Sequence, residues 1–404
     1  MNIWKISIQN MKSKPLYTFL SVFILSLSII LLLGIKQLKK SFEYQMENNL
    51  GDIDMVIGAK GSPLQLVLAS VLHIDNPTGN IVYQDAKNIA KNPLIKSAVP
   101  ISYGDNYKGF RIVGTSDTFT SFYHAELKAG HRVKKSMEVV LGASVAKQLG
   151  LQIGDTILSA HGLIKNSIEV HEEKLTVVGI LKPTFKVIDR LIITSLESVW
   201  DVHNHDKEHK HEDNHEAHHE AEDREITSLL VSFRSPRAFL TMPRKINEQT
   251  NMQAALPKFE LERLYQYTGI GLQTITAIAY VILIISGIIL FSSLYKMVKE
   301  RSFDLAILRT YGASNFQLIK IVAYEGCIIS FTALFLAFIF IKTGFIFIFK
   351  IMNVEDKLYM LQALSCEDLL NVAGLVFIIT IVSILMAVYP ILKMDISTIL
   401  SHEK

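Results

Sequence analysis

The sequence predicts a membrane protein in which four transmembrane helices carry a large extracytoplasmic α+β domain. Half of the 404 residues are hydrophobic and the mean hydropathy is +0.30, which is too apolar for an ordinary soluble protein. Four stretches also supply the roughly 20 apolar residues that a helix needs to cross about 30 Å of hydrocarbon. These predicted spans are 15–35, 268–295, 321–342 and 371–390.

Basic residues beside the spans predict the orientation, because short Lys- and Arg-rich flanks stay in the cytoplasm. Lys5, Lys12 and Lys14 precede the first span, and the 296–320 loop is basic as well. Both termini are therefore expected in the cytoplasm. The remaining segments are then a cytoplasmic amphipathic helix at 1–14, the extracytoplasmic domain at 36–267, a cytoplasmic loop at 296–320, a short outer loop at 343–370 and a cytoplasmic tail at 391–404.

A cleaved signal peptide is the alternative for the first span, but its apolar run exceeds the usual length of about 7 to 15 residues. Glu325, in the third span, is a functional candidate because an ionisable group is costly in lipid. We expect it to pair with Arg301 or Arg309 near the cytoplasmic interface, in a structural or coupling role. The net charge of +3 is small, so nucleic acid is not an expected partner.

The 36–267 segment alternates strand and helix patterns, which predicts a mixed α+β domain. Expected strands are 54–57, 98–103, 110–114, 175–180, 190–194 and 226–233, and expected helices are 85–91, 143–148 and 235–247. A G-x-x-x-x-G-K-[ST] phosphate loop does not occur, so the chain itself is not expected to bind ATP.

The apolar segment 63–74 must be buried, either in the core or on a surface that meets a lipid-like substrate or a partner. His73 and Asp75, two residues apart at its end, form a candidate substrate or metal site. A lone His-x-Asp is also common by chance, so a structural role remains the alternative.

Seven of the 13 histidines fall within residues 201–223, which contain almost no hydrophobic side chains and are expected to form a mobile loop. Imidazole is a preferred ligand of zinc and other transition metals, and carboxylates lie between the histidines. The segment therefore predicts metal binding, with a solvated acidic loop as the alternative. The candidate ligands are His203, His205, His209, His211, His215, His218 and His219.

Two overlapping H-E-x-x-H matches occur at 211–215 and 215–219. A metalloprotease carries that motif on a stable helix beside a cleft, which a low-complexity loop does not provide. Protease activity is therefore not expected.

The cytoplasmic loop predicts a short helix with an apolar stripe that needs a protein partner. Gly312 is expected to end this helix and Ser314 to cap the next one. The residues expected to meet the partner are Phe303, Ala306, Ile307, Leu308, Arg309, Tyr311 and Gly312.

The loop sequence ERSFDLAILRTYGAS resembles the E-R-x-x-E-I-x-x-L-R-x-x-G-A-S signature of FtsX/MacB-type ABC transporter permeases, with Asp304 in place of the usual Glu. The last residues, from Tyr389, resemble the closing motif of that family, with Ile396 where Pro is common. The resemblance covers the whole chain. It implies a porter-like outer domain with a small β-rich subdomain, in the bacterial inner membrane.

The resemblance also implies partners: a second copy of the chain, and a cytoplasmic ABC ATPase of the LolD/MacB type that binds the ATP. The permease would pass ATPase motion to its outer domain without being an enzyme. The histidine run and the GAKGSPLQ segment at 58–65 resemble permeases associated with bacterial zinc handling, which implies zinc and a secreted or periplasmic metal-binding protein as partners. Export of a lipid, peptide, antibiotic or haem, and mechanical activation of a cell-wall hydrolase, are the alternatives.

Overall fold

The computed structural model describes residues 3–160, 170–208, 224–351 and 362–392. Internal contacts divide the chain into two units, which we name the helical unit (1–42 and 268–404) and the α+β unit (43–267). The division falls within two long helices, α2 (Pro15–Leu50) and α9 (Pro257–Glu300).

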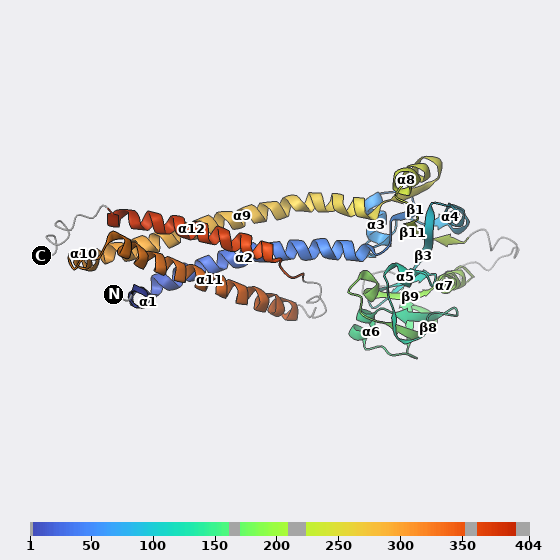
Figure 1. The fold of residues 1–404 in the computed structure, drawn as a ribbon. Coiled ribbons are helices and arrows are strands. Elements are labelled where there is room, and N and C mark those ends of the chain that lie inside the picture. The colour runs from blue at the N-terminus through green and yellow to red at the C-terminus, as the bar shows by residue number, and fades with distance from the viewer. Residues whose placement is uncertain (1–2, 161–169, 209–223, 352–361, 393–404) are drawn as a thin grey trace. The chain divides into compact units, whose positions relative to one another are not determined.

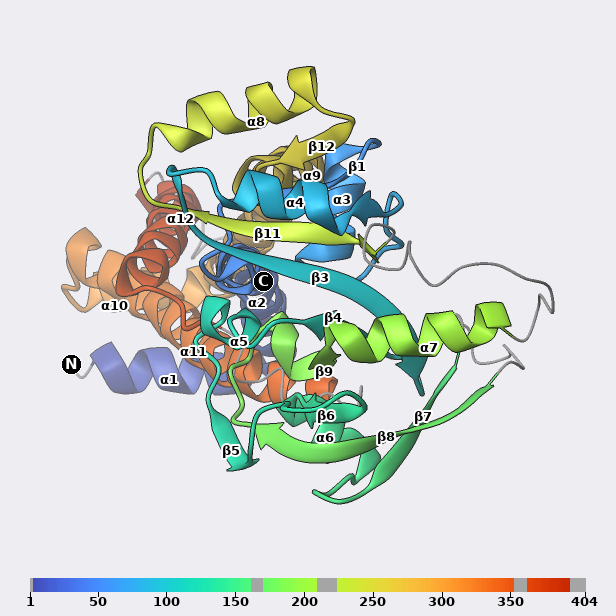
Figure 2. The same ribbon diagram turned by 90° about the vertical axis from the view of Figure 1, so that its right-hand side faces the viewer.

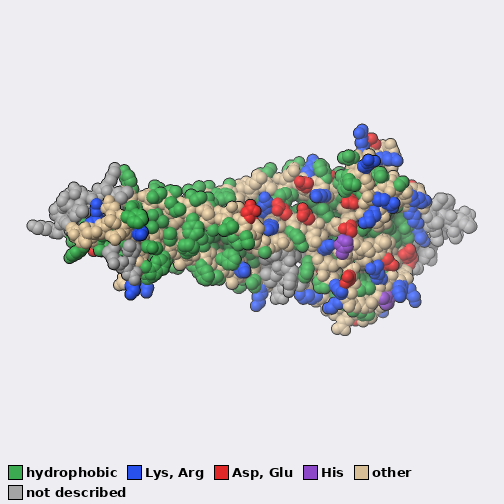
Figure 3. Space-filling model, in the orientation of Figure 1, with side chains coloured by type: hydrophobic (Ala, Val, Ile, Leu, Met, Phe, Trp, Pro, Cys, Tyr) green, Lys and Arg blue, Asp and Glu red, His purple; other side chains and the backbone are tan. Residues whose placement is uncertain are grey.

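The helical unit contains four helices that, among the described residues, are long and apolar enough to cross a membrane. Each is longer than the predicted span: α2 and α9 continue through polar residues, and α11 continues through the mostly apolar residues 343–351. Figure 3 shows hydrophobic side chains covering much of these helices, as lipid-facing surfaces require. Its helices are α1 (Ile3–Ser13), α2, α9, α10 (Ser302–Thr310), α11 (Asn315–Ile351) and α12 (Cys366–Leu392), labelled in Figure 1.

Small residues let the membrane helices approach one another closely. Ala279 on α9 and Ala333 and Ala337 on α11 are fully buried in one apolar cluster of the unit. A Cβ built on Gly326 of α11 would lie 2.8 Å from the Ile384 side chain of α12. Any larger residue at position 326 would require the Ile384 side chain to move.

Ten strands of the α+β unit form one mixed sheet within the described residues (Figure 2). The order is β12-β1-β11-β3-β4-β9-β6-β8-β5, with β7 paired to β3 and β8. The β4–β9 and β6–β8 pairs are parallel and the other pairs are antiparallel. The strands are β1 (Met55–Ala59), β3 (Ile95–Tyr107), β4 (Phe110–Thr115), β5 (Leu127–Gly130), β6 (Glu138–Leu141), β7 (Thr156–Ala160), β8 (Val170–Leu181), β9 (Leu191–Ser195), β11 (Ser228–Phe233) and β12 (Met252–Ala255); β2 (Ile81–Val82) and β10 (Glu225–Ile226) form a separate pair.

Both faces of the sheet are covered, and side chains alternate between two cores. Along β1, Val56 enters one core while Met55 and Ile57 enter the other. The first core also takes side chains of α3 (Pro63–Ser70) and α5 (Phe119–Phe122), and the second takes α4 (Tyr83–Ala90) and α8 (Ala238–Gln249). Burial on both faces explains why the strands β1, β4 and β9 are mostly apolar.

A third apolar cluster lies under α6 (Ala143–Leu149) and includes Val145 of that helix, Val139 of β6 and Ile157 of β7. The predicted helix at 143–148 is confirmed. Gly150 ends it with a φ of +67°, in the left-handed region where glycine is favoured.

The six predicted strands and three predicted helices of the outer domain are present, with ends shifted by a few residues. Residues 63–70 of the apolar 63–74 segment form helix α3 in the core, started by Pro63 and capped by Ser62, whereas Ile74 at the end of the segment is exposed. The expected loop from residue 201 begins instead as helix, because α7 (Leu196–Glu208) continues eight residues past Trp200. The sequence had predicted neither the short strands β5 and β7 nor the edge strand β12.

A buried carboxylate holds the turn between β8 and β9. Asp189, in the short 3₁₀ helix Val187–Arg190, accepts hydrogen bonds from the backbone N–H of Thr184 (2.9 Å) and Phe185 (2.7 Å) and from the Thr184 hydroxyl (2.8 Å). Several bonds to the charged form compensate for its burial.

We expect Asp189→Ala to lower the unfolding free energy by roughly 2–4 kcal/mol, because three donors lose a charged acceptor. Chemical denaturation of the full chain in detergent, with hydrogen exchange of β9 as the readout, measures the loss. Asp155→Ala is the control: its exposed carboxylate accepts from Gln152 N at 2.8 Å, and the loss there should stay below about 1 kcal/mol. Equal losses at the two positions would contradict the prediction.

Candidate functional site

The loop between α9 and α11 forms the compact helix α10, whose ends are set by local hydrogen bonds. Gly312 has a φ of +91°; its N–H donates to Arg309 O, and Ala313 N–H donates to Leu308 O, both at 3.0 Å. This is a Schellman motif. Ser314 then caps α11: its hydroxyl accepts from Gln317 N at 3.3 Å, while Gln317 Oε1 accepts from Ser314 N at 3.1 Å. Both predicted roles are confirmed.

The apolar stripe of α10 is divided between the chain's own core and the surface. Leu305 and Ala306 are buried, and Leu305 joins the core formed by Leu318 and Val322 of α11. Ala306 was expected to meet a partner, but this side chain is covered by its own chain. Phe303, Ile307, Leu308 and Arg309 are half-buried.

Two aromatic side chains at the C-terminal end of α10 remain open to solvent. Tyr311 is 86% exposed and Phe316, at the start of α11, is 63% exposed. Large exposed aromatic side chains are typical anchors of protein interfaces. Phe316 ends the predicted coupling segment 303–316, but it was not among the residues expected to contact the partner.

Glu325, on α11, is buried, with 3% of its surface exposed. Its Oε1 accepts a hydrogen bond from Asn10 Nδ2 of α1 at 2.8 Å. Among the described residues, the expected direct pair with Arg301 or Arg309 is not formed; Arg301 donates to Asn10 O at 3.2 Å and to Ser13 Oγ at 2.5 Å. The sequence had not indicated Asn10.

Among the candidate zinc ligands, His203 and His205 lie on the last turns of α7. His209, His211, His215, His218 and His219 lie outside the described residues. Trp200, on the second turn of α7, contacts the residues that follow this segment: its Nε1 donates to Glu225 O at 2.8 Å, and the Arg224 guanidinium lies 4.8 Å from its ring. The second turn of α7 therefore lies beside β10, while α7 itself continues to Glu208.

His73 is buried in the α+β unit, with a φ of +54°. Its Nδ1 lies 2.8 Å from the Tyr103 hydroxyl, which donates its single proton to Ala69 O, so Nδ1 carries the hydrogen and Nε2 is a buried acceptor. Burial, and then the charges of Arg111 and Arg190, lower the pKa of His73 from 6.5 to about 3.

Asp75 is half-buried; its carboxylate accepts from Asn76 N at 2.7 Å and its carbonyl accepts from Arg111 at 2.6 Å. Within the described ranges, no group of three or more His, Cys, Asp or Glu side chains is placed to hold a metal ion. The structure thus gives His73 and Asp75 local structural contacts, and the pair does not gain a third ligand from the described residues.

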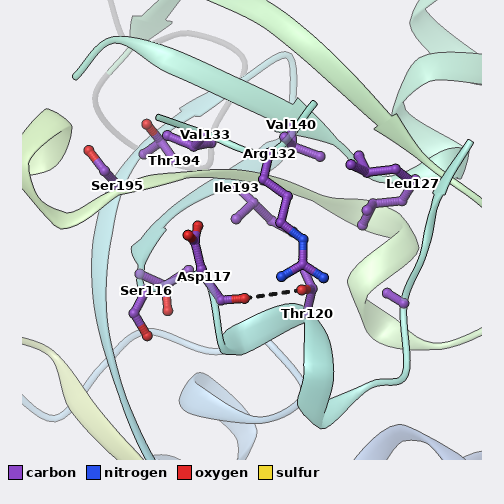
Figure 4. Close-up of a pocket in the computed structure, with 13 residues that line it drawn as sticks. Ser116, Asp117, Thr120, Leu127, Arg132, Val133, Val140, Ile193, Thr194 and Ser195 are labelled. Carbon is purple, nitrogen blue, oxygen red and sulfur yellow. Dashed lines mark hydrogen bonds between the residues drawn. The ribbon is translucent and has the colours of Figure 1, made fainter. Parts of the chain in front are cut away.

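The α+β unit also contains a small cavity of about 50 Å³ between β4, β6 and β9 (Figure 4). Leu127, Val133, Val140, Leu181 and Ile193 form apolar walls, and Arg132, Asp117 and Ser116 stand at the polar side. An engineered cavity of about 150 Å³ accepts benzene, so this one has room for a short aliphatic group. The sequence had indicated none of these residues, which are far apart along the chain.

Two family models match this chain, and together they span most of it. Residues 18–239 match the MacB-like periplasmic core domain, and residues 276–396 match the FtsX-like permease C-terminal domain. The chain belongs to the FtsX/MacB-type ABC transporter permeases. It is therefore a multi-pass protein of the bacterial inner membrane, and the α+β unit is its extracytoplasmic domain. Permeases of this family act with cytoplasmic ABC ATPases.

Several solved structures are similar to the permease. The periplasmic region of MacB from Actinobacillus actinomycetemcomitans is 12% identical, with 54% of this chain and 97% of that chain covered and a TM-score of 0.35. The extracellular domain of the Gram-positive transporter YknZ is 10% identical, with 50% and 98% covered and a TM-score of 0.31. A domain of a putative permease from Porphyromonas gingivalis is 14% identical, with 50% and 86% covered and a TM-score of 0.27. No curated protein sequence matches the chain.

His73 predicts how the stability of the permease responds to acid. The pKa of His73 in the folded state lies below its value in the unfolded state, so the unfolded state binds one more proton between pH 6.5 and about 3. The free energy of unfolding therefore decreases as the pH falls through that window. His73→Asn removes the titration, and asparagine tolerates the positive φ.

The stability of wild type relative to His73→Asn should fall by about 1 kcal/mol per pH unit below pH 6. Denaturation of the full chain between pH 4.5 and 7.5 measures this difference. His124→Asn is the matched control, since His124 also has a positive φ (+53°) but is exposed. A pH-independent difference at position 73 would contradict the burial of a neutral imidazole.

Proposed function

We propose that this permease transmits the motion of a cytoplasmic ATPase from α10 to the extracytoplasmic domain, and that it serves transition-metal handling, with zinc as the metal. The observation that carries the first part is the exposed pair Tyr311 and Phe316 beside a helix that its own core holds in place. A rigid helix with aromatic anchors is suited to transmitting motion between proteins, because the helix itself bends little when the partner moves it.

The partition of α10 supports this role. Leu305 and Ala306 attach one face to α11, while the Schellman motif at Gly312 holds Tyr311 at the exposed end. The motif allows a sharp turn, so the docking aromatics sit next to the first turn of a membrane helix. Displacement of α10 by a partner would therefore act directly on α11.

Tyr311→Ala and Phe316→Ala should each weaken binding of the partner ATPase by about 30-fold, since truncation of an aromatic anchor costs about 2 kcal/mol. Affinity between the purified permease in nanodiscs and its ATPase, identified by co-purification, measures the loss. Tyr267→Ala is the matched control, because Tyr267 is an exposed tyrosine of the extracytoplasmic domain. Equal effects at Tyr311 and Tyr267 would exclude α10 as the docking helix.

The zinc proposal is carried by the seven histidines within residues 201–223. Neutral imidazole and carboxylate ligands suit zinc, and so many donors in one short segment can supply a tetrahedral set. Trp200 of α7 contacts Arg224 and Glu225, which follow the segment, so metal binding to the segment would act on both α7 and β10. A second copy of the chain and a periplasmic metal-binding protein are the further partners that we propose.

Zinc should change the fluorescence of Trp200 in a Trp4→Phe permease, in which Trp200 is the single tryptophan left. Conversion of the seven histidines to glutamine should abolish this response and any zinc dependence of ATPase activity, whereas the same number of Asn and Gln changes elsewhere on the surface should not. An unchanged zinc response in the histidine-free variant would overturn the metal proposal.

The cavity at Arg132 favours a second function, export of a small amphipathic anion. Its apolar walls suit a short aliphatic group, and the guanidinium suits a carboxylate beside it. ATPase activity that ignores zinc but responds to such an anion, and loses the response in Arg132→Gln, would favour this function over zinc handling.

A further inference from the structure

The N-terminal helix α1 is bound to α11 by a row of specific contacts. Ser7 Oγ donates to Ile321 O at 3.2 Å, Asn10 Nδ2 donates to Glu325 Oε1 at 2.8 Å, and the rings of Trp4 and Tyr324 meet edge to face at 5.6 Å. The contacts follow one face of α1 over two turns. A helix held only by its amphipathic character in the lipid interface would not need such directional bonds.

The same helix is bound to the junction between α9 and α10. Arg301, at the N-cap position of α10, donates to Asn10 O and to Ser13 Oγ, and Lys14 forms an ion pair with Glu300 at 2.6 Å. Arg301 N donates to Val298 O of α9 and Arg301 O accepts from Leu305 N of α10, so this residue bonds to both helices. A shift of α10 thus acts on α1 at Arg301.

Asn10 is the residue at which the two sets of contacts meet. Its carbonyl accepts from Arg301 and its side-chain amide donates to Glu325. The Glu325 carboxylate is 3% exposed, and Asn10 is its hydrogen-bond donor among the described residues. A buried carboxylate that loses its donor keeps the full cost of desolvation, so α11 is strongly bound to α1 at this point.

We propose that Asn10 is a positioning residue that links α10 to α11, so that α1 works as a strap carrying displacement of the docking helix to Glu325. The proposal rests on the proposed docking of an ATPase at α10. It assigns Glu325 the role of an anchor inside the helical unit, with no ion passing through it. It also gives α1 a mechanical role besides its contact with lipid.

Hydrogen exchange of the full-length permease in nanodiscs tests the link without the ATPase. Asn10→Ala should increase exchange about tenfold in both α10 and the first two turns of α11, because the strap is released at Glu325. Gln9→Ala, at an exposed position of α1, is the matched control and should change neither. Increased exchange confined to α1 itself would overturn the link.

A charge exchange tests the contact itself. Asn10→Asp places a second carboxylate against Glu325 and should cause the same increase in exchange. The double variant Asn10→Asp/Glu325→Gln again pairs one amide with one carboxylate, with the donor now on α11 and the acceptor on α1. Exchange should return to within about twofold of wild type. Gln9→Asp adds the same charge at the exposed neighbour and should have no effect. Failure of the double variant to recover would overturn the proposal.

The assembled complex supplies the functional readout. Asn10→Ala should leave the affinity for the ATPase within about twofold and reduce the permease's effect on ATP turnover about tenfold, a split that general unfolding would not produce. Equal losses of affinity and turnover would overturn the proposal. A wild-type permease that does not affect its ATPase would refute the proposed function, while the exchange measurements would still decide whether Asn10 links α10 to α11.

Discussion

The bilayer offers no hydrogen-bond partners, and this constraint explains most features of the helical unit. Several polar side chains on its helices bond to their own or a neighbouring helix: Ser28 donates to Ile24 O, Thr276 donates to Leu272 O, and Ser330 pairs with Thr380 at 2.6 Å. A carboxylate cannot do this, because it only accepts and the helix N–H groups are already used. Glu325 therefore needs a donor from elsewhere, and α1 provides one through Asn10.

The α+β unit meets the same requirement with a sheet covered on both faces. Alternate side chains of the central strands enter different cores, and several polar groups that are buried there have partners nearby. Asp189 takes backbone N–H donors from its own turn, and Tyr103 joins His73 to Ala69 O. At the small cavity, the charged side chains of Arg132 and Asp117 lie beside apolar walls.

Sequence reasoning succeeded where the physical cause is local. Gly312 and Ser314 were predicted correctly because helix caps depend on residues three or four apart. It failed where the cause is long-range. Ala306 lies on the predicted stripe but is buried by α11, and Glu325 bonds to Asn10, which is 315 residues away in the chain. The strands β5, β7 and β12 are short, so their pairing partners rather than their own patterns define them.

The sequence by itself determined the four apolar spans, the α+β class of the extracytoplasmic domain and the family, because hydropathy, periodicity and the 299–314 motif are properties of contiguous residues. The tertiary structure alone decided which face of α10 is free, what Glu325 binds and how His73 is buried. These depend on which helices and strands pack together, and a buried polar group takes its partner from whatever that packing brings within about 3 Å.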